Sequence, residues 1–114
     1  MYDAQLKPVS NRADWIETIE LIDDDTEQVI TDLSGVTMVI EIRDPSYRRC
    51  LYGTTENGHI TFAGFGVIQW AFNRQEMSQL CAGTYEIGIT VKRDGITEQE
   101  LIGSLPVVDG VVRQ

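Results

Sequence analysis

Apolar and polar residues alternate along most of the chain, which is the pattern of β-strands that bury one face. The clearest case is TYEIGITVKR, Thr84 to Arg93, whose apolar side chains fall on one side of a strand. A second is VTMVIEIRD, Val36 to Asp44, which we expect to end at Pro45 because proline cannot donate a ladder hydrogen bond. Two further strands are predicted from ADWIETIELI and from GVIQWAFN, where Ile68, Trp70 and Phe72 share a face.

Turn signals separate these segments. Asp94-Gly95 predicts a two-residue hairpin turn, since both residue types accept positive φ angles. Asn57-Gly58 gives the same prediction for a hairpin between RRCLYGTT and HITFAG. The acidic run from Asp23 to Glu27 predicts a solvated turn after the first strand.

One short helix of about two turns is predicted after the strand that ends at Phe72. Asn73 can accept from the first-turn amides, and Glu76 can reach back to the Asn73 amide. Met77, Leu80 and Cys81 then follow at helical spacing. We expect this helix to connect two strands and to end before Gly83.

These elements predict an all-β, antiparallel sandwich of about seven or eight strands with one short helix. The length of 114 residues fits a single domain, 1–114, with an extended N-terminal arm over 1–12 and an exit strand or tail over 107–114.

Charge and composition narrow the range of possible partners and functions. The net charge of -9 and the pI near 4.4 disfavour nucleic acid and anionic membranes as partners. The N-terminus is polar and no apolar run is long enough to span a bilayer, so we expect a soluble protein made in the cytoplasm. Cys50 and Cys81 are expected to be buried free thiols, with a disulfide between them as the minority alternative.

The chain offers little catalytic chemistry. His59 is its single imidazole, and no nucleophile motif accompanies it, so we predict no enzyme activity and no catalytic residues. The acidic run lacks the spacing of a calcium loop, and the glycines at 53, 64 and 66 lack the surroundings of a phosphate loop. We therefore predict no metal site and no cofactor.

Two surface features remain. Tyr47 and Tyr52 are the aromatic residues on the loop side that could stack on a sugar, so a carbohydrate-binding module for host-surface adsorption is the alternative function. Arg48 and Arg49 form the one local basic pair, which either meets a neighbouring subunit's carboxylates or lies solvated at a strand start.

The order of segments resembles the immunoglobulin-like structural domain of tailed-phage tail, baseplate and fibre proteins, including the N-terminal domain of upper baseplate proteins. The resemblance rests on SNRADW (10–15), DLSGVTMVIEIRD (32–44), LCAGTYEIGITVKRDG (80–95) and IGSLPVVDGVVRQ (102–114). It covers the chain from about Asn11 to Arg113. Val112 departs from the family's usual threonine, and family members usually continue beyond this point.

The resemblance implies an immunoglobulin-like fold and a non-enzymatic structural role in a tailed-phage virion, as a tail, neck or fibre-attachment adaptor. The partners would be other virion proteins and other copies of the chain, for which the resemblance implies a trimer. The location would be the virion, after synthesis in the host bacterial cytoplasm. We expect the apolar terminal segment to present unpaired strand edges to a neighbour, with Val107, Val108, Val111 and Val112 as contact residues beside Arg48 and Arg49. On this view, truncation after Pro106 leaves a folded monomer that no longer assembles.

Overall fold

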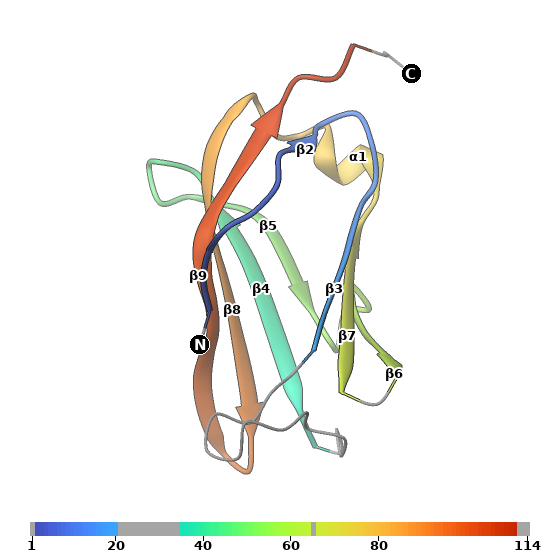
Figure 1. Cartoon of the computed structure of the whole chain (residues 1–114), viewed down its shortest axis with the longest axis vertical. Helices are drawn as coiled ribbons and strands as arrows, with labels where there is room; N and C mark the ends of the chain where they lie inside the picture. The colour runs from blue at the N-terminus through green and yellow to red at the C-terminus, as the bar shows by residue number, and fades with distance from the viewer. Residues whose placement is uncertain (1, 21–34, 65, 112–114) are drawn as a thin grey trace.

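The computed structural model describes residues 2–20, 35–64 and 66–111, which form nine strands and one short helix (Figure 1). The strands are β1 (Tyr2–Gln5), β2 (Val9–Ser10), β3 (Trp15–Glu20), β4 (Thr37–Arg43), β5 (Arg49–Thr54), β6 (Ile60–Gly64), β7 (Val67–Phe72), β8 (Gly83–Arg93) and β9 (Ile96–Val108), and the helix is α1 (Arg74–Met77). The described chain is thus mostly β, as the alternation predicts.

The strands form two sheets that face each other across one core (Figure 1). The large sheet has the order β1-β9-β8-β4-β5, with β2 also paired to β9, and the small sheet has the order β3-β7-β6. Every second residue of β4 points inward, so Met38, Ile40 and Ile42 are fully buried. Trp70 and Phe72 of β7 close the core from the opposite sheet.

The β8–β9 hairpin confirms the turn predicted from Asp94-Gly95. Asp94 has a φ of 54° and Gly95 a φ of 78°, the left-handed pair that a tight hairpin turn requires. Arg93 pairs with Ile96 directly across the turn.

The hairpin predicted around Asn57-Gly58 is wrong. β5 pairs with β4 in the large sheet, whereas β6 pairs with β7 in the small one, so this connection crosses between the sheets. Only Gly58 takes a positive φ. The Asn57 side chain instead accepts from the amides of Thr54, at 2.9 Å, and His59, at 3.1 Å, which closes a loop rather than a primed turn.

The predicted N-terminal arm is not an arm over the residues described. β1 runs parallel to β9, with Tyr2 opposite Leu101, and β2 continues the pairing with Val9 opposite Val107. These two strands raise the strand number above the predicted seven or eight and make the large sheet mixed rather than antiparallel. Residues far apart in sequence pair here, which local patterning cannot reveal.

The C-terminal segment also differs from its prediction. Val107 is a core residue with 4% of its surface exposed, and its backbone lies between β8 on one side and β2 on the other. The expected unpaired edge is therefore absent at Val107, and Val108 is paired with Ser10 of β2. Truncation after Pro106 would remove part of the core, so it cannot leave the intact monomer that the prediction assumed.

The helix confirms its predicted cap. The Glu76 amide donates to Asn73 Oδ1 at 2.9 Å, and the Asn73 amide donates to Glu76 Oε1 at 3.1 Å. The helix is shorter than predicted, with four residues. Met77 and Leu80 are buried, whereas Cys81 is exposed. In the described residues, no helix is both long and apolar enough to cross a membrane.

Candidate functional site

A groove of about 830 Å³ crosses the outer face of the large sheet. Strands β4, β8 and β9 form its floor, and β1 borders it through Gln5. Its main polar and apolar side chains are those of Gln5, Glu41, Arg43, Tyr47, Glu86, Thr90, Gln99, Ile102 and Ser104, and Gly88 lies among them. This surface is referred to below as the outer groove.

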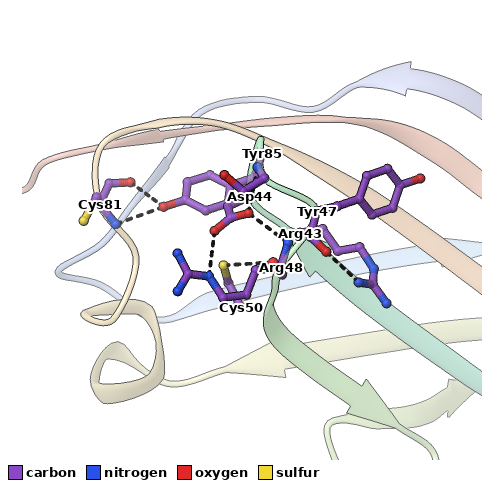
Figure 2. A network of polar contacts seen from close by, with 8 residues as sticks. Arg43, Asp44, Tyr47, Arg48, Cys50, Cys81 and Tyr85 are labelled. Carbon is purple, nitrogen blue, oxygen red and sulfur yellow. Dashed lines mark hydrogen bonds and ion pairs between the residues drawn. The ribbon is translucent and has the colours of Figure 1, made fainter.

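Tyr47 is presented at the groove by a tightly bonded loop. It has a φ of 68°, uncommon for a residue with a bulky side chain, and 69% of its surface is exposed. Arg43 supports it twice: Nη1 donates to the Tyr47 carbonyl at 2.8 Å, and the guanidinium carbon lies 5.6 Å from the ring centroid. Figure 2 shows the Tyr47 ring directed away from the rest of the loop.

Asp44 closes this loop. Its Oδ1 accepts from the amides of Ser46 and Arg48, both at 2.9 Å, and its Oδ2 lies 3.2 Å from Arg48 Nε. The hydrogen bond from the Arg48 amide, together with the nearby Arg48 guanidinium, lowers the pKa of Asp44 below its ordinary value. The carboxylate therefore stays ionised to a lower pH than an ordinary aspartate and holds the loop.

The two arginines predicted at an interface are exposed but already have partners in the chain. Arg48 pairs with Asp44, and Arg49 Nη1 lies 3.7 Å from Glu41 Oε1. Arg49 also stacks on Tyr52, with 4.3 Å between the guanidinium carbon and the ring centroid. Of the two tyrosines predicted to bind a glycan, Tyr47 lines the outer groove and Tyr52 does not.

Tyr85 ties the helix end to the start of β8. Its hydroxyl donates to the Cys81 carbonyl at 2.9 Å and accepts from the Cys81 amide at 3.0 Å (Figure 2). Burial raises the pKa of Tyr85 above its ordinary value, although the hydrogen bond with Cys81 opposes this shift. Cys50 and Cys81 are both free thiols, but the prediction that both are buried is wrong, because Cys50 is half-buried and Cys81 is exposed.

Replacing Tyr85 with phenylalanine is expected to lower the free energy of unfolding by about 2 kcal/mol at pH 7, because the Cys81 carbonyl and amide both lose a partly buried hydrogen bond. Since folding raises the tyrosine pKa, its stabilising effect is complete below about pH 10 and declines as the pH rises through the folded-state value. Urea unfolding at pH 7 and pH 11 should show the difference between the two proteins shrinking at the higher pH. Tyr52→Phe is the control, and an equal loss of stability in both variants would contradict this role for the Tyr85 hydroxyl.

His59 lies in a separate small hollow of about 300 Å³ beside α1. Its Nε2 is 2.6 Å from Glu76 Oε2 and its Nδ1 is 3.1 Å from Asn57 Oδ1, so both ring nitrogens have partners. Its ring also packs 4.9 Å from that of Phe72. These contacts join the loop between β5 and β6 to the cap of α1, so His59 has a structural role.

Asn11 is a site that the sequence reasoning missed. It is 3% exposed, and its Nδ2 donates to the Leu80 carbonyl at 2.9 Å and to Asp109 Oδ1 at 2.6 Å, while its Oδ1 accepts from the Gly110 amide at 3.0 Å. One side chain thus joins three distant segments. An asparagine inside a polar pre-strand stretch gives no local sign of such burial.

The groove residues beyond Tyr47 were also missed, because they meet only when β4, β8 and β9 pair. The available signal was Gly88, an isolated glycine inside an otherwise regular strand, which indicates a close approach or a hollow.

The acidic run from Asp23 to Glu27, predicted as a solvated turn, lies outside the described residues, as does Val112. Across 2–20, 35–64 and 66–111, no three His, Cys, Asp or Glu residues gather as a metal site would require.

No protein-family model matches the chain, and no curated protein matches it in sequence.

Proposed function

We propose that the chain is an immunoglobulin-like module. Three features support this assignment: a three-stranded sheet facing a larger one, an N-terminal strand parallel to the last strand, and the bond from Tyr85 at the start of β8 back to Cys81. The last of these corresponds to the tyrosine corner of immunoglobulin-like sandwiches, in which a tyrosine hydroxyl bonds to the backbone a few residues upstream.

The module's proposed role is that of a non-enzymatic structural component of a tailed-phage virion, in the tail, neck or fibre-attachment region. The observation that carries this proposal is where the resembling motifs lie. SNRADW supplies the buried Asn11, LCAGTYEIGITVKRDG supplies the Tyr85 joint and the β8–β9 turn, and the final motif supplies Gly110. The resembling motifs therefore contain residues that connect segments of the sandwich, rather than scattered surface residues.

The contact with a neighbouring subunit is proposed at the C-terminal end of β9. Val108 is half exposed and Val111 is 93% exposed, so both can bury apolar surface against another chain. Arg48 and Arg49 can add polar contacts to such an interface. Val107 no longer belongs to this proposal, because it fills the core of its own chain.

The test is incorporation into particles. Tailed particles purified on a density gradient from a bacterium that encodes the chain should contain it, as measured by quantitative mass spectrometry. Val111→Asp should reduce incorporation about tenfold, because an aspartate would be buried in an apolar contact.

Ile96→Asp is the matched control, since Ile96 is 62% exposed and begins β9 at the β8–β9 turn, whereas the proposed contact lies beyond the opposite end of this strand (Figure 1). It should leave incorporation unchanged. A chain abundant in the lysate but absent from particles would contradict the virion role. Full incorporation of Val111→Asp would contradict the proposed interface but not the virion role.

A further inference from the structure

We propose that the outer groove binds a neutral oligosaccharide. The proposal concerns a ligand of the isolated protein, so it stands independently of a place in the virion. It rests on the shape of the groove, on the polar side chains that lie unused in it, and on the presentation of Tyr47.

The shape comes from Gly88 on β8. Gly88 faces Glu41 across the β4–β8 pair and Ile102 across the β8–β9 pair, so a position without a side chain lies between two strands that carry them. A Cβ atom built at Gly88 would meet only Gln99 Nε2, at 3.6 Å. The missing side chain therefore leaves a hollow, and at about 830 Å³ the groove falls within the size range of small-ligand sites.

The hydrogen-bonding groups around this hollow are available to a ligand. Among the described residues, no hydrogen bond or ion pair engages the side chains of Gln5, Glu86, Thr90 or Ser104, all of which line the groove. Gln99 donates its Nε2 to the carbonyls of Ile89 at 3.0 Å and Leu101 at 2.7 Å, which fixes the amide and leaves its Oε1 to accept. Amide, hydroxyl and carboxylate groups at one site match the neighbouring hydroxyls of a sugar.

Tyr47 supplies the apolar contact that a sugar ring also needs. Its loop is fixed by Asp44, and Arg43 lies over the ring, so little side-chain entropy remains to be lost on binding. Its left-handed backbone conformation is a form of strain that is found at ligand contacts. Ile102, half exposed on the floor, offers a second apolar surface to the C–H groups of the sugar.

The charges favour a neutral ligand over an anionic one. Arg43 Nη2 lies 2.8 Å from Glu41 Oε2, and Arg49 also pairs with Glu41, so the two guanidinium groups share one carboxylate and neither is free for an anionic ligand. Glu86 lines the groove without an ion-pair partner among the described residues, so its carboxylate offsets the second guanidinium, and the whole chain carries a net charge of -9. A polyanionic glycan would find no excess of positive charge at the groove and would be repelled by the net charge of the chain.

The first experiment is a glycan microarray probed with the full chain, followed by ¹⁵N NMR titration with the neutral oligosaccharides that bind. Amide shifts should cluster at Gly88, Ile102 and Ser104, and not in the small sheet. Cellotetraose, maltotetraose and chitotetraose serve as fixed probes at about 10 mM, where even weak sites are occupied. Tetragalacturonate is the anionic comparison and should bind at least about tenfold more weakly.

Two variants test the site itself. Gly88→Val should abolish binding while the chain stays folded, because valine fills the hollow, suits a strand, and places its Cβ no closer than 3.6 Å to Gln99 Nε2 among the described residues. Tyr47→Ala should weaken binding about tenfold, as expected for an aromatic anchor.

Each variant has a matched control. Gly64→Val makes the same exchange on β6 at an exposed position, and Tyr52→Ala truncates a tyrosine on the same sheet outside the groove. Both should bind as the unaltered chain does.

Three outcomes would overturn the proposal. One is that no neutral glycan on the array or among the fixed probes binds. Another is that binding persists in Gly88→Val. The last is that only a lysine-rich peptide shifts the groove amides, which would indicate a polypeptide occupant.

Discussion

Replacing Asn11 with alanine is expected to lower the free energy of unfolding by about 3 kcal/mol. The substitution removes the donor to the Leu80 carbonyl and the acceptor of the Gly110 amide, and it leaves these groups without partners where water has little access. It also frees Asp109, whose carboxylate is held by the same side chain at 2.6 Å.

Urea unfolding monitored by tryptophan fluorescence measures this loss, because Trp15 and Trp70 are both buried. Gln75→Ala is the control: Gln75 is exposed on α1, and its replacement should change stability by less than about 0.5 kcal/mol. A loss below about 1 kcal/mol for Asn11→Ala would mean that the three segments hold together without this side chain.

Gly53→Ala, which adds a single methyl group, is expected to lower the free energy of unfolding by about as much as Asn11→Ala does. A Cβ atom there would lie 2.8 Å from His59 Cβ, 2.9 Å from Ile40 Cγ2 and 3.1 Å from Phe72 Cζ. β5 approaches the small sheet closely at this point, and neither a backbone-adjacent Cβ nor a packed ring can move aside cheaply. Gly53→Ala should therefore lower the free energy of unfolding by about 3 kcal/mol, through strain rather than through a lost contact.

Gly64→Ala provides the comparison, because no heavy atom of the described residues, chain neighbours aside, lies within 4 Å of a Cβ built at Gly64. It should change the unfolding free energy by less than about 0.5 kcal/mol. Equal effects of the two substitutions would show that strand glycines act here through the unfolded chain, not through the packing around Gly53.

Features that depend on a few neighbouring residues could be predicted from the sequence. The inward-facing residues of β4, β7 and β8 follow from alternation, the helix cap follows from Asn73 and Glu76, and the β8–β9 turn follows from Asp94-Gly95. In each case, the residues that determine the structure are close in sequence.

Features that depend on pairing between residues far apart in the sequence could not be predicted in this way. Asn57-Gly58 is a strong local hairpin signal, yet the strands on either side find better partners in different sheets. In the sequence, Val107 belongs to an apolar segment that suggests a free tail, and only the fold places Val9 of β2 beside it. Likewise, Tyr47 could be singled out as an exposed aromatic residue, but Glu86, Gln99 and Ile102 join it only through sheet formation.

The parallel pairing of β1 with β9 has a consequence for biosynthesis. Residues 2–5 find their partners only at 101–104, so β1 cannot pair until the ribosome has made β9. The nascent chain can close β8 against β4 earlier, but the outer edge of the large sheet forms last. Such non-local closure slows folding and makes the unpaired strand a target for chaperones until β9 has been made.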